Sequence, residues 1–437
     1  MKLTPIIGLE VHVELKTNTK MFCGCSAEYF GKEPNTHTCP VCLGLPGALP
    51  VPNKTAIEWC IMIAQALNCS INTFSKFDRK NYFYPDLSKG FQISQYDLPF
   101  GVKGFITLKS GKKIGITRVH MEEDTGKLIH QSVDGTKKSL VDFNRCGVPL
   151  VEIVTEPDFD NAKDVVEYLQ SLQQIVRYLN VSNADMEKGD MRLEPNISLT
   201  ETPGKLPPYK VEVKNINSFK FVEKAITYEL ARQEEILNKG EIPPQETRGW
   251  DESKNLTFSQ RIKEEANDYR YFPEPDIPPL RHTEEQISSI KSRVPELREE
   301  KVARFIKNYE ISDYDASQLT KTSSSADRFE QTVSLGKEKN ISSKQIAKVL
   351  TNKKVSDSAT PEEILIFIAS SLQMDAIDPL ELKGIITKVL SENEKAVADY
   401  KSGKESVIMF LVGQCMRTID RKIDVQIVKA ALISALR

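Results

Sequence analysis

Acidic side chains and histidines recur at alternate positions in several short stretches of this sequence. In "GLEVHVEL", Glu10, His12 and Glu14 alternate with aliphatic residues. Successive side chains of a β-strand point to opposite faces, so a strand here sends the two acids and the histidine to one face. The stretches "MRLEPNISL", "YKVEVKN" and "KIGITRVHMEED" alternate in the same way. Their polar sides would carry Arg118, His120, Glu122, Asp124, Arg192, Glu194, Asn196, Ser198, Lys210, Glu212 and Lys214.

So much negative charge on one face requires water, protons or a cation. Two carboxylates about 4 Å apart repel by about 4 kcal/mol at an effective dielectric constant of about 20. Glu152 lies in "VPLVEIVT", which is otherwise apolar, so its carboxylate also needs a partner. Carboxylates with a histidine suit magnesium or manganese, and interspersed lysine and arginine suit the phosphates that such a metal carries.

We therefore interpret these stretches as a candidate metal-nucleotide site. The alternative is the solvated face of an antiparallel sheet, where charged residues need no function. A Walker A loop is not the phosphate-binding device, because "EEDTGKL" lacks the upstream glycine and the following serine or threonine.

Four cysteines have the spacing of a zinc site. "CGC" at 23–25 and "CPVC" at 39–42 are separated by thirteen residues, which predicts zinc on Cys23, Cys25, Cys39 and Cys42. Four thiolate ligands would close the coordination sphere, so the zinc would be structural. The alternatives are four reduced thiols without metal, or His37 in place of one cysteine.

Two other features carry weaker signals. Cys146 in "DFNRCGVPL" invites a nucleophile interpretation, but the sequence assigns it no catalytic partner, which favours a buried thiol. Aromatic and basic residues alternate in "FDRKNYFYPDLSKGFQISQYD" and "NDYRYFPEPD". Such stretches stack on unpaired bases in some proteins and simply pack at a rim in others.

The elements that must position these residues form an α+β protein. A chain of 437 residues exceeds the size of one core, so two or three domains are expected. Period-two patterns with turn residues dominate up to about residue 280, which predicts a large, mostly β body. After "YFPEPDIPPL" helical patterns follow, with a serine-rich loop at "LTKTSSSAD" and a break at "QMDAIDP". We expect domains at residues 1–290, 291–372 and 373–437.

Composition restricts the partners and the compartment. The charges of the 61 acidic and 59 basic residues nearly cancel, so the net charge does not indicate a nucleic-acid partner. A local basic patch would still be sufficient to bind one. The first residues lack the apolar core of a signal peptide, and nowhere do eighteen apolar residues run together. We expect a cytoplasmic chain with no membrane contact, in which cysteines bind metal more often than they form disulfides.

Several longer motifs, in order, resemble one known family. They are "IGLEVHVEL", "CPVCLGLPGALPVPN", "RKNYFYPDLSKGFQISQYD", "HMEEDTGK", "FNRCGVPLVEIVTEPD", "VEVKNINSFKFVEKAI" and "DYRYFPEPDIPP". Together they are similar to the B-type subunits of the aspartyl/glutamyl-tRNA amidotransferases, the GatB/GatE family. The segment "ENEKAVADYKSGKESVIMFLVGQCM" resembles the YqeY-like tail of that family.

This resemblance implies a ligase component that forms C–N bonds within a heterotrimer. The B-type component of that family binds misacylated tRNA(Gln) or tRNA(Asn) and phosphorylates the attached Glu or Asp with ATP. Ammonia that the amidase component releases from glutamine then displaces the phosphate, and a small third component completes the complex. The large β domain would be the family's cradle-like catalytic domain, and the tail would contact the tRNA elbow.

The resemblance also assigns residues. It implies catalytic roles for Glu10, His12, Glu123 and Glu212. Candidate magnesium or manganese ligands are Glu10, His12, Glu122, Glu123, Glu152, Glu194 and Glu212. The zinc ligands would be Cys23, Cys25, Cys39 and Cys42. Candidate contacts for the nucleotide or the tRNA acceptor end are Lys80, Tyr82, Lys89 and Gln95. Glu194 departs from the family, which commonly has Asp there.

Three other interpretations remain. The archaeal paralogue, the GatE type, shares the catalytic domain but carries an inserted domain, and the helical residues 290–375 are short for it. A zinc-stabilised tRNA-binding scaffold without catalysis predicts that the carboxylates are dispensable. A free-standing ATP-dependent ligase would need its own ammonia source, and the sequence contains no glutaminase nucleophile motif.

Overall fold

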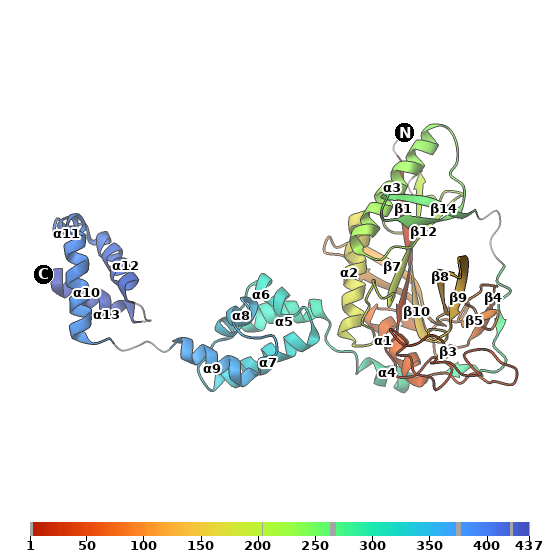
Figure 1. Ribbon diagram of the computed structural model, residues 1–437, viewed down its shortest axis with the longest axis horizontal. Coiled ribbons are helices and arrows are strands. Elements are labelled where there is room, and N and C mark those ends of the chain that lie inside the picture. The colour runs from red at the N-terminus through yellow and green to blue at the C-terminus, as the bar shows by residue number, and fades with distance from the viewer. Residues whose placement is uncertain (1–2, 203, 263–267, 373–376, 420–422, 437) are drawn as a thin grey trace. The chain divides into compact units, whose positions relative to one another are not determined.

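The computed structural model describes residues 3–202, 204–262, 268–372, 377–419 and 423–436. The chain divides into two compact units, Met1–Lys301 and Val302–Arg437. Figure 1 shows strands and helices mixed in the first unit and helices alone in the second. This arrangement confirms the predicted α+β class, a large antiparallel sheet followed by a helical region.

A nine-stranded sheet forms the centre of the first unit. Its order is β14-β13-β12-β11-β1-β10-β7-β6-β2, and every neighbouring pair is antiparallel except β12 and β13. The strands are β1 (Thr4–Glu14), β2 (Ser70–Ile71), β6 (Gly101–Thr107), β7 (Lys113–Glu123), β10 (Pro149–Thr155), β11 (Met191–Thr200), β12 (Val211–Lys214), β13 (Glu246–Asp251) and β14 (Leu256–Ile262). The predicted polar-apolar stretches therefore lie in one sheet, with β12, β11 and β1 adjacent and β7 separated from β1 by β10.

Smaller sheets flank this centre. β15 (Phe272–Pro273), β4 (Asp78–Asn81) and β5 (Phe91–Ser94) form one, and β16 (Leu280–Arg281) pairs with β3 (Phe74–Ser75). β8 (Lys127–Val133) and β9 (Thr136–Asp142) form a hairpin.

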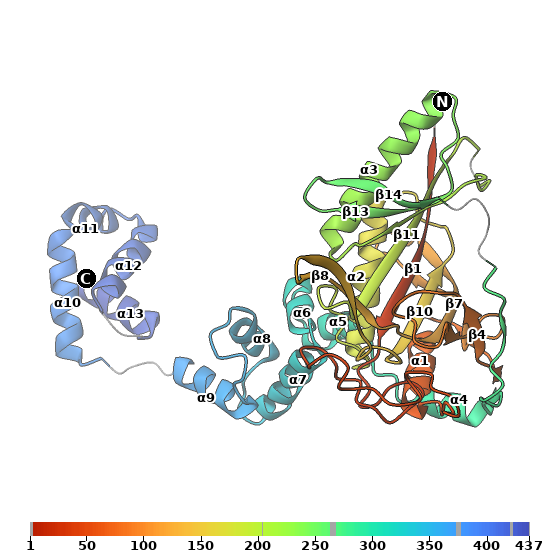
Figure 2. The ribbon, with the colours of Figure 1, turned by 45° about the vertical axis from the view of Figure 1, so that its right-hand side comes forward.

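Helices cover the apolar face of the large sheet. Ile7, Leu9, Val11 and Val13 of β1 are at most 1% exposed and share one core with α1 (Lys54–Ala66), α2 (Ala162–Tyr178) and α3 (Phe219–Asn238). Figures 1 and 2 both show α2 alongside the strands. Because side chains alternate along a strand, burying this face leaves Glu10 and His12 on the other.

The mostly β description was incomplete, because it did not include α1, α2 and α3. Apolar residues of α2 at helical spacing, such as Val165, Leu169, Leu172 and Val176, are fully buried. Each such aliphatic side chain stabilises the fold by about 1.5–3 kcal/mol. The unit also contains α4 (Glu284–Lys291).

In the described part of the second unit, all regular elements are helices. The helix α5 (Arg298–Tyr309) starts just before the unit boundary. It packs with the next helices, up to α9 (Pro361–Leu372), around a core that includes Phe305 and Phe329. A separate core around Leu411 and Leu432 belongs to the helices from α10 to α13. The remaining helices are α6 (Asp313–Leu319), α7 (Ser323–Lys337), α8 (Ser343–Thr351), α9 (Pro361–Leu372), α10 (Pro379–Glu392), α11 (Glu394–Lys401), η1 (Glu405–Val407), α12 (Ile408–Thr418) and α13 (Val425–Leu436).

One local prediction in this unit was wrong. The predicted loop "LTKTSSSAD" contains the start of α7, because the Thr322 side chain accepts a hydrogen bond from the Ser325 backbone and caps the helix. The three predicted domain ranges stay predictions, and residues 373–376 at the second boundary lie outside the described part. Among the described residues, no helix has both the length and the apolar character needed to cross a bilayer.

Candidate active site and metal centres

Three glutamates from neighbouring strands form what we call the Glu cluster. Glu10 of β1 lies opposite Glu194 of β11, and Asn196 of β11 lies opposite Glu212 of β12. One carboxylate oxygen each of Glu10, Glu194 and Glu212 lies within 4.8 Å of the others. An octahedral magnesium ion with bonds of about 2.1 Å places its ligand oxygens roughly 3–4 Å apart. The Glu cluster therefore fits a hard divalent cation after small side-chain adjustments.

Lys214 compensates part of this negative charge. Its Nζ atom lies 2.7 Å from Glu194 Oε2 and 3.2 Å from Glu212 Oε1. The Thr247 hydroxyl donates a hydrogen bond of 2.8 Å to Glu212 Oε2. Burial raises the pKa of Glu194, against the lowering effect of Lys214. One lysine for three carboxylates leaves an excess of negative charge that a bound cation would neutralise.

A second group, the His/Glu cluster, lies on the same face of the sheet. It consists of His12 of β1, Glu152 of β10 and Glu122 of β7. His12 Nε2 lies 3.5 Å from Glu152 Oε2 and 3.8 Å from Glu122 Oε2. His120 of β7 lies opposite Glu152, and its Nε2 is 3.3 Å from Glu152 Oε2 and 3.5 Å from Glu122 Oε1. The carboxylates are thus held by two imidazoles.

Buried charges of opposite sign set the protonation of this cluster. Burial lowers the pKa of His12, but Glu152, Glu194 and Glu122 outweigh it and raise the pKa to about 9. Burial raises the pKa of Glu122, but the attraction of Lys80 and His120 outweighs it and lowers the pKa to about 2. The Lys80 Nζ atom lies 3.6 Å from Glu122 Oε1. Glu122 is therefore ionised at neutral pH, as a metal ligand or phosphate-site acid must be.

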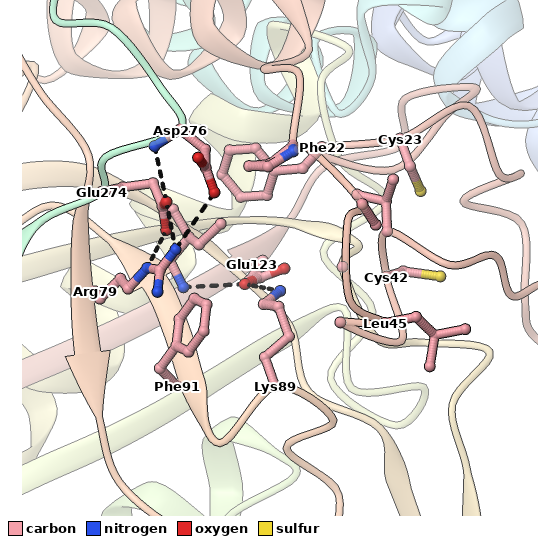
Figure 3. A pocket seen from close by; sticks show the side chains of 16 residues that line it. Phe22, Cys23, Cys42, Leu45, Arg79, Lys89, Phe91, Glu123, Glu274 and Asp276 are labelled. Carbon is pink, nitrogen blue, oxygen red and sulfur yellow. Dashed lines mark hydrogen bonds and ion pairs between the residues drawn. The ribbon is translucent and has the colours of Figure 1, made fainter.

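Glu123 lies apart from both clusters. It follows Glu122 directly on β7, so its side chain points to the other face. There it forms an ion pair with Lys89 and accepts a hydrogen bond of 3.0 Å from the Ile93 backbone (Figure 3). The pair lines a cavity of about 160 Å³ that also contains Arg79, in contact with Glu274. Glu123 can act on the polar face only through a rearrangement, so its predicted catalytic role gains no geometric support.

The predicted nucleotide contacts are spread over different surroundings. Lys80 contacts Glu122 of the His/Glu cluster, whereas Lys89 lies in the cavity beside Glu123. The Tyr82 ring packs edge-on against Tyr269, with 6.1 Å between ring centroids. Gln95 is buried, and its amide oxygen accepts a hydrogen bond from the Met121 backbone. Of these four residues, Lys80 has a side-chain contact to a carboxylate of the polar face.

The four predicted zinc ligands come together in the long connection between β1 and α1. The sulfur atoms of Cys23, Cys25, Cys39 and Cys42 lie within 4.8 Å of one another, and His37 is not part of this Cys cluster. A tetrahedral zinc ion with bonds of about 2.3 Å needs sulfur atoms about 3.8 Å apart. A hydrogen bond from Cys23 is the main reason that the pKa of Cys42 falls to about 5. The four sulfurs fit zinc after a small contraction.

Two members of the polar face received no individual role in the sequence analysis. Lys214 and His120 each stand two positions from a predicted ligand, at 212 and 122, and so share its face. That spacing was visible in the sequence. Their pairing with carboxylates of other strands was not, because it depends on the strand order.

Two family models together cover nearly the whole chain. Residues 5–288 match the model described as "GatB/GatE catalytic domain", and residues 292–436 match the model described as "GatB domain". Both clusters on the sheet and the Cys cluster fall within the first match.

Curated relatives are similar over nearly their full lengths. The chain is 45% identical over 467 residues to a protein of Thermosipho melanesiensis, with 97% of each chain covered. It is 45% identical over 457 residues to a protein of Carboxydothermus hydrogenoformans, with 94% of each covered, and 44% identical over 460 residues to one of Thermotoga maritima, with 95% of each covered. All three are named as the B-type subunit of aspartyl/glutamyl-tRNA(Asn/Gln) amidotransferase.

Proposed function

The chain belongs to the GatB family, the B-type subunits of the aspartyl/glutamyl-tRNA(Asn/Gln) amidotransferases, and on this premise we propose that it activates the side-chain carboxylate of an amino acid attached to tRNA. The substrates would be Glu-tRNA(Gln), Asp-tRNA(Asn) or both. The observation that carries the proposal is the pair of carboxylate clusters side by side on the polar face of one sheet.

The reaction needs an activation step because a carboxylate is a poor electrophile. An oxygen of the substrate carboxylate attacks the γ-phosphorus of ATP, the bond to the bridging oxygen breaks, and ADP leaves. The product is an acyl phosphate. The lone pair of ammonia then attacks its carbonyl carbon, phosphate leaves with the bonding electrons, and the proton lost by nitrogen ends on phosphate. The amide product is Gln-tRNA(Gln) or Asn-tRNA(Asn).

The residues of the polar face would position charge for this transfer. Glu10, Glu194 and Glu212 would hold magnesium, and bound magnesium would neutralise phosphate charge. Lys214 and Lys80 add fixed positive charge beside the two clusters. In phosphoryl transfer most of the catalysis comes from such positioning and charge stabilisation.

The His/Glu cluster would act together with the Glu cluster in this site. His12, Glu122 and Glu152 would bind a second cation or orient the substrate, with His120 and Lys80 fixing the carboxylates. Residues on neighbouring strands of one sheet keep such a geometry more accurately than loop residues do.

The remaining parts of the chain would serve the complex. The Cys cluster would bind structural zinc, and the helices from α10 to α13 would contact the tRNA elbow. A partner amidase would supply ammonia, and a small third component would complete the heterotrimer. The reaction would take place in the cytoplasm.

Amidation with ammonium chloride in place of glutamine tests the proposal, because ammonium bypasses the partner glutaminase. The reconstituted complex receives Glu-tRNA(Gln), ATP and ammonium chloride, and tRNA-dependent ADP release and Gln-tRNA formation are followed. Glu10→Gln should lose both products by a factor of 100 or more while it still binds tRNA. The exposed Glu201 lies beyond the end of β11, so Glu201→Gln is the matched control and should behave like the unaltered chain. Full activity of Glu10→Gln would favour the scaffold alternative.

A further inference from the structure

Lys20 is a fully buried lysine that contacts both halves of the Cys cluster. Its side chain is 0% exposed. Its backbone N–H donates a hydrogen bond of 2.9 Å to the carbonyl oxygen of Cys25. Its Nζ atom donates a hydrogen bond of 2.7 Å to the carbonyl oxygen of His37 and lies 3.8 Å from the Sγ atom of Cys42. One residue therefore joins the "CGC" segment to the "CPVC" segment.

The ammonium group of Lys20 has an incomplete set of partners. An ammonium carries three donors and a full charge, and burying it is costly unless a negative group lies beside it. In the part of the chain that the structure describes, no carboxylate oxygen lies within 4 Å of its Nζ. The carbonyl oxygen of His37 offers only a partial charge. The sulfur of Cys42 is the one contacting atom that can carry a full negative charge.

A metal thiolate centre would supply the negative charge that the buried Lys20 ammonium needs. Four thiolates around a divalent ion carry a net charge of −2, since four negative charges are offset by two positive ones. Without the metal the cluster carries less negative charge and compensates the buried ammonium less well. The ammonium therefore stabilises the loaded centre more than it stabilises the empty one.

We propose that Lys20 is the buried counter-ion of a metal centre formed by the Cys cluster and is a positioning residue for a soft divalent cation such as zinc. The Lys20 ammonium donates a charged N–H···S hydrogen bond to Cys42, and the centre and its counter-ion together carry a net charge of −1. A second donor reaches the same sulfur, because the Cys39 backbone N–H lies 3.1 Å from Cys42 Sγ. The inference rests on the proposed zinc site but not on the amidation chemistry.

Zinc competition on the full chain tests the role of the charge. Lys20→Met removes the charge at nearly constant side-chain length, and Lys20→Gln keeps an N–H donor for the His37 carbonyl without the charge. Removing a residue that hydrogen-bonds to a metal ligand weakens metal binding roughly 10- to 100-fold. We expect both variants to lose zinc affinity by this factor in competition with a chelator. Lys32 is exposed in the same connection, so Lys32→Met is the control and should bind zinc like the unaltered chain. Unchanged zinc affinity in Lys20→Met, or in Lys20→Gln, would overturn the counter-ion role.

Thermal unfolding with and without zinc separates charge from packing. Lys20→Met should lower the unfolding temperature of the zinc-loaded chain more than that of the chelated chain, because the loaded centre carries the larger negative charge. A decrease of equal size in both states, or failure to fold in both, would show a packing role and contradict the inference. If the unaltered chain binds no zinc, the zinc site and this inference fail together. The ammonium chloride assay would still decide the amidation proposal separately.

Discussion

Replacing Arg192 with methionine should destabilise the first unit by about 3 kcal/mol. The Nη2 atom of Arg192 lies 2.5 Å from Asp124 Oδ2 and 3.8 Å from Glu14 Oε1, and both carboxylates are at least 94% buried. At an effective dielectric constant of about 20, the closer pair attracts by about 7 kcal/mol. Arg192 is 33% exposed, and Arg145 also reaches Asp124 at 3.7 Å, so we expect less than half of that value to be lost.

The chain offers a selective probe for this measurement. Trp59 and Trp250 are its only tryptophans, and both belong to the first unit. Urea unfolding followed by tryptophan fluorescence therefore reports that unit. With a slope of about 3 kcal/mol per molar urea, the midpoint of Arg192→Met should fall by about 1 M. Among the described residues, the exposed Lys239 forms an ion pair with the exposed Glu235, so Lys239→Met should leave the midpoint unchanged.

Two results would refute this reasoning. Burial acts to raise the pKa of Asp124, but Arg145 and Arg192 outweigh it and hold that pKa well below its usual range. The stability that the pair contributes is thus present above about pH 4 and is lost as the pH falls. The difference between Arg192→Met and the unaltered chain should shrink in acid, and adding Asp124→Asn should recover most of the loss. An undiminished difference at low pH, or simple additivity of the two substitutions, would show that the guanidinium acts through packing alone.

Three further predictions concern Gly44 in the connection between β1 and α1, the zinc site and the Glu cluster. Gly44 has φ +68°, and an added Cβ would collide with Lys89, so Gly44→Ala should cost about 1–3 kcal/mol in the same urea assay; an unchanged midpoint would contradict this. Elemental analysis should find one zinc ion per unaltered chain and none for Cys42→Ser. Cys60→Ala should retain the zinc, because Cys60 lies in the core outside the Cys cluster. Glu212→Gln should reduce tRNA-dependent ADP release at least 100-fold at unchanged tRNA affinity, and a loss below 10-fold would remove it from the site.

Local patterns were sufficient to predict the strands that carry the two carboxylate clusters. The alternation around Glu10 and His12 predicted β1 and its polar face, because burial of one face forces this period. The same rule separates Glu122 from Glu123, since neighbours on a strand point to opposite faces. The assignment of both as ligands of one site stays a prediction, and it would require Glu123 to turn toward the polar face.

Strand order and long-range pairing could not be predicted. β1 is first in the chain but lies between β10 and β11, and this position brings Glu10 next to Glu194 and His12 next to Glu152. No local pattern contains that information. The Cys cluster was predictable because its ligands are close in sequence, but the buried side chain of Lys20 beside it was not.

Trapping the activated carboxylate tests the central claim most directly. The complex is given Glu-tRNA(Gln) and ATP without any ammonia source, and hydroxylamine is added to capture an acyl phosphate as the hydroxamate. We predict one hydroxamate per ADP released for the unaltered chain and for Glu201→Gln, and none above background for Glu10→Gln and Glu212→Gln bound to the same tRNA. Hydroxamate formation at the unaltered level by Glu10→Gln would contradict the assignment of the phosphorylation step to this face of the sheet.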